Sequence, residues 1–337
     1  MINLMHKNVI LFCPSFFDYD KAIKEELESI GATVHLYDER PFKSIIGRAI
    51  LRLNMSWIIS WYIKMYYYRL LIPLINNVDY LVFINPESIS SNIIDKVRGV
   101  NPKVNIIVYM WDSFKNKPAA KKLLNSVDCF FTFDPNDAAT YNICFLPLFY
   151  VSEYAESRGS NSGKYRLSFI GTAHTERYKI VKNIMEVGGR GFLFLFTPSM
   201  AVFLYKKYIC GELKELRFTD VSSTPMLRED VVTIVADSEA IIDINHPGQV
   251  GLTMRTLEVL GAGRKLVTTN ENIVNYDFYN ESNILIIRNE INKDVITKFL
   301  DRPYVKLSDK LYEKYNLSNW IEQLFSGGLS GKYKSKT

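Results

Sequence analysis

The residues best suited to ligand chemistry stand close together in residues 241–270, which read IIDINHPGQVGLTMRTLEVLGAGRKLVTTN. The pattern predicts a strand, a loop that contains Gly248 and Gly251, a short helix at about residues 253–260, and a second strand. A loop with free backbone N–H groups at the start of a helix is a natural anion site. Glu258, the one carboxylate on this helix, can reach sugar hydroxyls beside the anion. The stretch therefore predicts a site for a nucleotide sugar.

This loop and helix supply most of the predicted contacts to the donor. The backbone N–H groups at residues 252–254 would meet the pyrophosphate, and Gln249 and His246 would lie near the sugar, although His246 can also be a structural loop residue. Glu258 has an alternative role, because Arg255 three residues before it could pair with it on a solvated helix face. The residues of this loop and helix that we predict to bind the donor are His246, Gln249, Gly251, Leu252, Thr253, Arg255 and Glu258.

A second candidate loop, GTAHTER, follows an apolar strand and leads into a helix. Gly171 permits close backbone approach, Thr172 offers a hydroxyl, and Arg177 offers a guanidinium fork for phosphate. His174 is a catalytic candidate, since it could face the transferred sugar or its phosphate. The alternative is an ordinary strand-to-helix turn in which Thr175 is the N-cap.

Three carboxylates in the first half of the chain follow predicted strands. Asp112, in the sequence WDS, could accept a proton from an acceptor hydroxyl, or it could cap a helix. Asp134, in FDPN, is better explained as a helix cap, and Glu87, in NPE, is a weaker acceptor-side candidate. Asp112 is therefore the predicted base if the reaction needs one.

Other site chemistries find no support in the sequence. There is no P-loop, no GxGxxG and no GxSxG motif. The histidines lack the spacing of metal ligands, and the cysteines, which form no CxxC pair, are expected to be small buried hydrophobes. We therefore predict no metal and no cofactor besides the nucleotide-sugar co-substrate. The histidines are His6, His35, His174 and His246, and the cysteines are Cys13, Cys129, Cys144 and Cys210.

Length and composition predict a two-domain globular protein. A chain of 337 residues exceeds what one hydrophobic core usually supports. Its 47% hydrophobic and 23% charged residues are ordinary for a globular protein. The net charge of +5 comes without a long basic run, so no nucleic-acid partner is predicted. Weak attraction to anionic membranes or phosphorylated substrates is compatible with it.

Apolar strands alternate with helices along both halves of the chain. This order predicts an α/β fold, with parallel sheets covered on both faces and a ligand beyond the carboxyl ends of the strands. A stretch rich in Gly and Ser, residues 151–164, predicts a linker. The predicted strands are residues 8–13, 33–37, 80–84, 104–110, 129–133, 167–170, 192–196, 240–244, 265–269 and 284–287.

Residues 45–75 interrupt this alternation with an aromatic and basic segment. Its charges recur too often for a membrane span. It can be a long helix or helix pair that covers the sheet, or an interfacial helix that binds a membrane surface. The N-terminus lacks the features of a signal peptide, so we expect a cytoplasmic protein, with peripheral binding to the inner face of the cytoplasmic membrane as a further hypothesis.

An ordered set of motifs resembles the bacterial GT-B glycosyltransferases, in particular CgeB-like proteins found with capsule and O-antigen synthesis functions. The motifs are YMWDSF, FTFDPND, LPLFY, LSFIGTAHTERY and HPGQVGLTMRTLEVLGAGRKLVTTN, within residues 8–287. The resemblance implies two facing Rossmann-like domains, a metal-independent reaction, and an acceptor bound by the first domain. We place these domains at residues 1–155 and 164–306, followed by closing helices at 307–325 and a disordered tail at 326–337.

The resemblance also implies roles for single residues. LEVLGAGRKLVTT is similar to the segment around the second Glu of the E-x7-E motif, which implies that Glu258 contacts the nucleotide ribose. The first Glu of that motif falls at Val250, so the motif is half present, and Gln249 substitutes in part. The family's phosphate-binding loop corresponds to Gly171, with Arg177 as its basic partner.

The sequence thus predicts a glycosyltransferase that transfers a sugar from a nucleotide sugar to a glycan or glycolipid acceptor in surface-polysaccharide synthesis. If the reaction inverts configuration, Asp112 is the predicted base. If it retains configuration, the leaving phosphate can take the proton instead. The alternatives are another GT-B nucleotide-sugar enzyme, such as an epimerase or hydrolase, and a non-catalytic scaffold partner.

Overall fold

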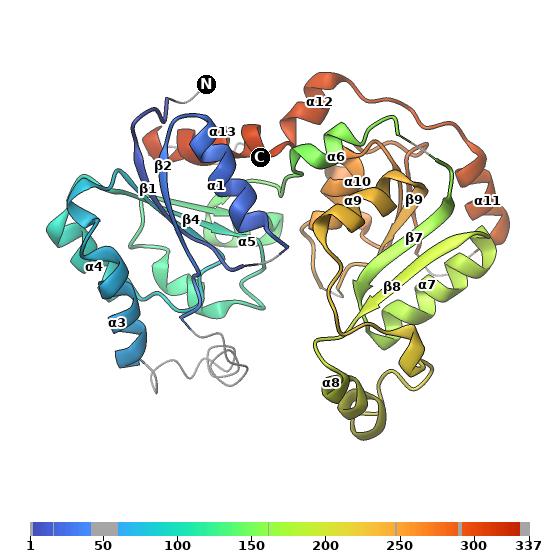
Figure 1. Ribbon diagram of the computed structural model, residues 1–337. Coiled ribbons are helices and arrows are strands. Elements are labelled where there is room, and N and C mark those ends of the chain that lie inside the picture. The colour runs from blue at the N-terminus through green and yellow to red at the C-terminus, as the bar shows by residue number, and fades with distance from the viewer. Residues whose placement is uncertain are drawn as a thin grey trace. The chain divides into compact units, whose positions relative to one another are not determined.

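The computed structural model describes two compact units, each built on its own parallel sheet (Figure 1). Unit 1 combines residues 1–148 with residues 317–337, and unit 2 comprises residues 149–316. The residues described are 3–15, 17–41, 60–160, 162–246, 248–288 and 292–330.

Unit 1 contains a six-stranded sheet in the order β2-β1-β3-β4-β5-β6, with every neighbouring pair parallel. Its central strands are continuous apolar runs that are buried along their length, as expected for a sheet with both faces covered. The strands are β1 Asn8–Phe12, β2 Thr33–Tyr37, β3 Tyr80–Ile84, β4 Asn105–Met110, β5 Cys129–Thr132 and β6 Cys144–Phe145.

Helices cover both faces of the unit 1 sheet, because successive strand side chains point to opposite sides. Phe12 and Phe83 pack with α3, α4 and η3 in one core, whereas Tyr80 and Tyr109 face α13 on the other side. Helix α1 packs against α13. The elements are α1 Tyr19–Ser29, α3 Ser60–Leu71, η2 Ile75–Asn77, α4 Ser91–Val100, η3 Pro118–Leu123, α5 Pro135–Tyr141 and α13 Leu317–Ser330.

Helix α13 brings the end of the chain back to unit 1. The Trp320 ring meets Tyr109 edge-on, with ring centroids 4.8 Å apart. A Cβ atom added to Gly327 would lie 2.5 Å from the Phe131 ring, so this close approach requires glycine. Residues 326–330, predicted as part of a disordered tail, belong to this helix, and residues 331–337 lie outside the described residues.

Helix α3 forms most of the described part of the aromatic and basic segment, residues 60–75. Its buried residues Ile63, Tyr67 and Leu71 pack in the core of the sheet. Helix α3 therefore covers the sheet, as the first of the two hypotheses for this segment predicted. Trp61 and Met65 point outward and are 71% and 50% exposed. Residues 42–59 lie outside the described residues. No helix in the described ranges has the length and apolar character needed to cross a membrane.

Unit 2 contains a five-stranded parallel sheet in the order β11-β10-β9-β7-β8. The central strand β9 and its neighbour β7 carry the candidate loops at their carboxyl ends. The strands are β7 Tyr165–Thr172, β8 Gly191–Phe196, β9 Ser238–Asp243, β10 Lys265–Thr268 and β11 Ile284–Ile286.

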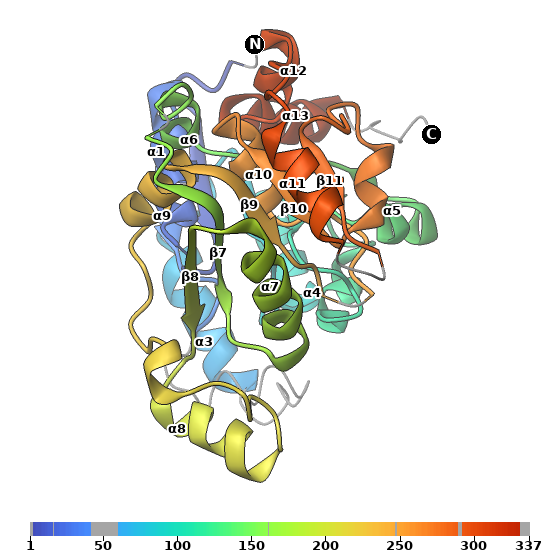
Figure 2. The same ribbon diagram turned by 90° about the vertical axis from the view of Figure 1, so that its right-hand side faces the viewer.

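Two layers of helices enclose the unit 2 sheet (Figure 2). Helices α7 and α11 pack together and share one core with β7 and β9, while α6 contacts α9 and α10. The elements are α6 Ser152–Glu156, α7 Thr175–Gly188, α8 Met200–Leu204 with a π-helix at Tyr205–Ile209, η5 Phe218–Asp220, α9 Arg228–Ala236, α10 Met254–Gly261, η6 Glu271–Asn275, α11 Lys293–Asp301 and α12 Asp309–Lys314.

The chain passes between the units at two places that lie side by side on unit 2. The Tyr150 N–H donates to the Tyr315 carbonyl over 3.0 Å, and Tyr150 forms an isolated parallel bridge with Asn316. The first passage, at residues 148–149, precedes the predicted linker, which contains helix α6.

The four cysteines differ in burial. Cys13 and Cys129 are buried, whereas Cys144 is half-buried and Cys210 is exposed. The expectation that all four are buried is therefore wrong for Cys210, which follows the π-helix on the surface of unit 2.

Candidate functional site

The two candidate loops of unit 2 begin on neighbouring strands. Because β7 and β9 are parallel and adjacent, their carboxyl ends lie at the same edge of the sheet. Strand β7 continues through Gly171 and Thr172, which pair with β8, so the predicted strand end at Ile170 was two residues too early. Pairing with β8 extends the strand through the glycine. Only Ala173 and His174 then connect β7 to α7.

Helices α7 and α10 start at this edge with different caps. Thr253 is the N-cap of α10, and its hydroxyl oxygen accepts the Thr256 N–H over 3.2 Å. Thr175 is the first residue of α7 rather than its N-cap, and its hydroxyl oxygen accepts the Leu213 N–H over 2.9 Å. His174 occupies the N-cap position, is exposed, and makes no capping bond through its side chain. Its side chain can therefore meet a ligand at this edge.

Asp243, the last residue of β9, fixes the start of α10. It is buried, and its Oδ2 accepts the hydroxyls of Thr253 and Thr256 over 2.5 and 2.7 Å. Burial raises the pKa of Asp243, while the two hydroxyls and the guanidinium groups of Arg255 and Arg177 lower it. No role was predicted for this carboxylate, although a single Asp in an apolar strand is a visible signal in the sequence.

Arg177 and Arg255 place positive charge at the N-terminal ends of two helices. Both act electrostatically on Asp243, so the two guanidinium groups lie near the same carboxylate. Burial lowers the pKa of Arg177, and Asp243 opposes that effect. A helix N-terminus carries partial positive charge and normally favours acidic residues, yet the first turn of α10 has none. Arg177 and Arg255 therefore add positive charge at the carboxyl edge of the unit 2 sheet, where α7 and α10 begin.

Glu258 lies one turn further along α10 and holds Arg255. The residue is 5% exposed, and its Oε2 lies 2.5 Å from Arg255 Nη1. The Tyr154 hydroxyl of α6 contacts both side chains, and burial, followed by Glu258, raises the pKa of Tyr154 well above its ordinary value. The ion pair predicted as the alternative role of Glu258 is thus present, but the pair is largely buried, so the predicted solvated helix face is wrong. The contact of Glu258 with a ribose stays a prediction.

The loop between β9 and α10 is held by its own side chains and by the loop after β10. The Gln249 N–H donates to the His246 carbonyl over 3.0 Å, and Gln249 Nε2 donates to the Gly251 carbonyl over 3.3 Å. Asn270 Nδ2 also donates to Gly251, over 3.4 Å. Leu252, whose backbone N–H was predicted to meet the pyrophosphate, is buried. His246 is exposed.

The acceptor-side candidates lie in unit 1. The Asp112 carboxylate accepts the Ser113 N–H over 2.9 Å and Asn116 Nδ2 over 2.8 Å, so it fixes a turn. No helix begins at Asp112, and the helix-cap alternative is therefore wrong there. Asp134 is the N-cap of α5, and its side chain accepts the N–H groups of Asn136 and Asp137. This confirms the favoured interpretation of Asp134 as a helix cap.

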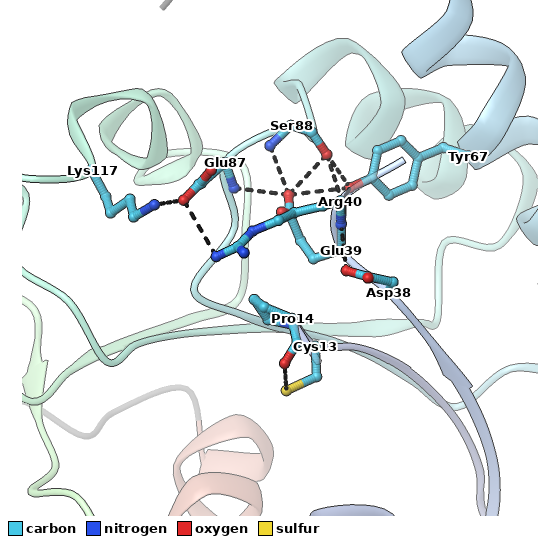
Figure 3. Close-up of polar contacts among 9 residues, drawn as sticks. All are labelled: Cys13, Pro14, Asp38, Glu39, Arg40, Tyr67, Glu87, Ser88 and Lys117. Carbon is cyan, nitrogen blue, oxygen red and sulfur yellow. Dashed lines mark hydrogen bonds and ion pairs between the residues drawn. The ribbon is translucent and has the colours of Figure 1, made fainter. Parts of the chain in front are cut away.

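Glu87 is part of a larger polar cluster at the carboxyl edge of the unit 1 sheet (Figure 3). It forms ion pairs with Lys117 and, at 3.8 Å, with Arg40. Glu39, for which the sequence predicted no role, is fully buried, and its Oε1 accepts the Glu87 N–H over 2.8 Å. Burial raises the pKa of Glu39 to about 7. Its only sequence signal is a carboxylate that closely follows a strand.

In the described ranges, no three or more His, Cys, Asp and Glu side chains are grouped so that they could hold a metal ion.

No protein-family model matches the sequence, and no curated protein matches it. Its fold is similar to AviGT4, a glycosyltransferase of avilamycin A biosynthesis, with a TM-score of 0.59 and 11% identity over 96% of this chain and 97% of that one. Anabaena HepE in complex with UDP-glucose has a TM-score of 0.56 and 8% identity, over 96% and 100%. UDP-GlcNAc 2-epimerase from Methanocaldococcus jannaschii has a TM-score of 0.52 and 10% identity, over 96% and 100%.

These similarities and the two parallel sheets with alternating helices establish the fold. The chain has the GT-B architecture of two Rossmann-like domains that the sequence predicted.

Proposed function

We propose that this protein is a glycosyltransferase whose unit 2 binds the diphosphate of a nucleotide-sugar donor. The observation that carries the proposal is the pair Arg177 and Arg255, each in the first turn of a helix and both close to buried Asp243. The fold is shared with a glycosyltransferase and with a protein solved with UDP-glucose, which supports the same reading.

The chemistry of sugar transfer explains why two arginines would be placed there. As the bond to the donor sugar breaks, negative charge develops on the leaving diphosphate. Preorganised N–H donors and guanidinium groups at a helix start stabilise that charge without reorganising. Arg255 is held by its ion pair with Glu258, and Arg177 lies in the electrostatic field of Asp243. The Gly171 turn would bring backbone close to the same phosphates.

The donor sugar and ribose would lie beside these phosphates. Thr172 and His174 are exposed at the same sheet edge and are our candidates for contact with the transferred sugar. Glu258 would contact the ribose, as the resemblance implies, or act by holding Arg255. Gln249 and His246 belong to the loop next to Thr253, where they would meet the sugar or its nucleotide.

Unit 1 would bind the acceptor, which we propose to be a lipid-linked glycan of surface-polysaccharide synthesis. Helix α3 supports a membrane-borne acceptor, because its sequence SWYIKMYYYRLL contains no acidic residue. Trp61, Met65, Lys64 and Arg69 are exposed, and such aromatic and basic groups suit the surface of an anionic membrane. Asp112 would be the base in an inverting reaction. Its two hydrogen bonds to the following turn would keep its carboxylate in place.

A second candidate is a nucleotide-sugar epimerase or hydrolase, since an epimerase shares the fold. Such an enzyme would use the same donor site without an acceptor. A non-catalytic scaffold is the third candidate, because Val250 stands where the motif would have its first Glu.

A donor screen separates these three candidates. Purified protein is incubated with a panel of nucleotide sugars, with and without lipid-linked glycan acceptors, and both the released nucleotide and the sugar product are measured. Transfer predicts nucleotide release that depends on the acceptor and a glycan that gains one sugar. Acceptor-independent release or an isomerised donor would favour the second candidate, and no turnover with any donor would contradict an enzyme.

A further inference from the structure

Glu39 bridges two loops that are not neighbours in the unit 1 sheet. It follows β2, and its Oε1 accepts the N–H groups of Glu87 and Ser88, over 2.8 and 2.7 Å, in the turn that follows β3 (Figure 3). The sheet order places β1 between these two strands. The Glu39 carboxylate therefore reaches across the carboxyl end of β1 to hold a turn on its other side.

Hydroxyl groups complete the bridge. Ser88 Oγ lies 2.9 Å from Glu39 Oε1 and 2.7 Å from the Glu39 carbonyl, and the Tyr67 hydroxyl lies 3.0 Å from that carbonyl. Glu39 Oε2, by contrast, has no hydrogen-bond partner among the residues that the structure describes. Of the two carboxylate oxygens, Oε1 thus accepts the hydrogen bonds, which is an arrangement suited to holding a turn.

The held turn presents Glu87. Its first residue, Asn85, has a φ of 50°, a left-handed conformation that costs free energy in a residue with a side chain and needs support from its surroundings. Beyond it, the Glu87 carboxylate pairs with Lys117, from the segment after β4, and with Arg40, from the loop after β2. Three loops at the sheet edge are therefore tied to one another through Glu39 and Glu87.

We propose that Glu39 is a positioning residue for acceptor binding: it holds the turn after β3 and so fixes the Glu87 carboxylate and its two cations at the carboxyl edge of unit 1. This inference rests on the proposed function, in which unit 1 binds the acceptor. A carboxylate with adjacent cations offers both acceptors and donors to sugar hydroxyls, and this recognition depends on the position of the turn.

The strength of the hold depends on the charge of Glu39. An ionised carboxylate accepts N–H donors about twice as strongly as a neutral acid. Burial raises the pKa of Glu39 to about 7, while the hydrogen bonds from Ser88 and Tyr67 and the positive charge of Arg40 oppose that effect. The other groups near this edge are Asp20, Asp38 and the buried thiol of Cys13. We therefore expect the hold to tighten as the pH rises through about 7.

The test compares wild type with Glu39→Gln, which keeps the acceptor oxygen but cannot ionise. For wild type, kcat/KM for the acceptor should rise severalfold as the pH passes through about 7, whereas KM for the donor should not follow this change. In Glu39→Gln the rise should disappear and the value should stay at its low-pH level. Asp79→Asn is the control, because Asp79 lies in the same unit immediately before β3, at the opposite edge, and should leave the rise intact.

Hydrogen exchange tests the hold without any substrate. In Glu39→Ala the amides of Glu87 and Ser88 should exchange faster, and in Glu39→Gln they should stay protected. Unchanged exchange in Glu39→Ala overturns the proposal, as does an acceptor pH profile that is the same in wild type and Glu39→Gln. An absence of turnover in wild type refutes the proposed function instead, so the two failures are distinguishable.

Discussion

Replacing Glu39 by glutamine should remove a pH dependence from the stability of unit 1. In the folded protein the pKa of the buried Glu39 is raised from 4.5 to about 7 by burial. The folded state therefore holds this proton more tightly than the unfolded state does. Its contribution to the unfolding free energy is complete below the unfolded pKa and is lost as the pH rises to about 7.

The size of this effect follows from the shift. A difference of about 2.5 pH units corresponds to about 3 kcal/mol of unfolding free energy, because one unit is worth about 1.4 kcal/mol. Glutamine has no such proton, so the stability of Glu39→Gln relative to wild type should increase by about 3 kcal/mol between about pH 4.5 and about pH 8.

Urea unfolding followed by tryptophan fluorescence measures this difference. All four tryptophans of the sequence belong to unit 1, so the signal reports the unit that contains Glu39. Asp79→Asn provides the control: Lys7 and the Asn8 N–H overcome partial burial and hold the pKa of Asp79 below its ordinary value. Its stability relative to wild type should therefore stay flat above about pH 5. If the Glu39→Gln difference changes by less than about 1 kcal/mol over the range, the assigned burial and ionisation of Glu39 are refuted.

Three further changes test the packing of unit 2, each by urea unfolding. Gly261→Ala would put a Cβ 2.5 Å from the Tyr150 ring and should lower the unfolding free energy by about 1–3 kcal/mol. Gly99→Ala, a control in unit 1 whose added Cβ meets no atom within 4 Å, should not destabilise the protein. Equal effects of the two changes would contradict this packing. Lys265→Met should cost about 2–4 kcal/mol, because the buried ammonium donates to the carbonyls that end α11; a neutral result would show that this bonding is dispensable. Thr256→Val should cost about 1–3 kcal/mol by removing one donor to Asp243, and no loss would refute a tight Asp243 anchor.

The sequence predicted the sheets well because their strands are continuous apolar runs. The run YLVFI became β3 with the predicted bounds, and both sheets are parallel, as strands separated by helices require. Predicted strand ends were wrong where pairing with a neighbouring strand decides them. Strand β7 runs through Gly171 and Thr172 because β8 pairs with them. The predicted closing helices at residues 307–325 are α12 and α13, and α13 returns to unit 1, where Trp320 packs on Tyr109.

Some contacts of the candidate sites could be predicted from the sequence and others could not. Local spacing was enough to anticipate the pair of Arg255 and Glu258, which are three residues apart on one helix. The bridge from Glu39 to Ser88 joins residues 49 positions apart, and no local pattern shows that they meet. Contacts of this kind depend on the register and order of the strands, which are set by packing across the whole sheet.

The most direct test of the donor site is the binding of a nucleoside diphosphate measured by calorimetry. Wild type should bind at least one nucleoside diphosphate, and Arg177→Gln and Arg255→Gln should each weaken binding about 10-fold or more, since a charge-assisted hydrogen bond contributes about 1.5–3 kcal/mol. Arg190→Gln is the matched control, because Arg190 precedes β8 at the opposite edge of the same sheet and should leave the affinity unchanged. Affinity that is the same in wild type and in both arginine variants would contradict a diphosphate site at the starts of α7 and α10.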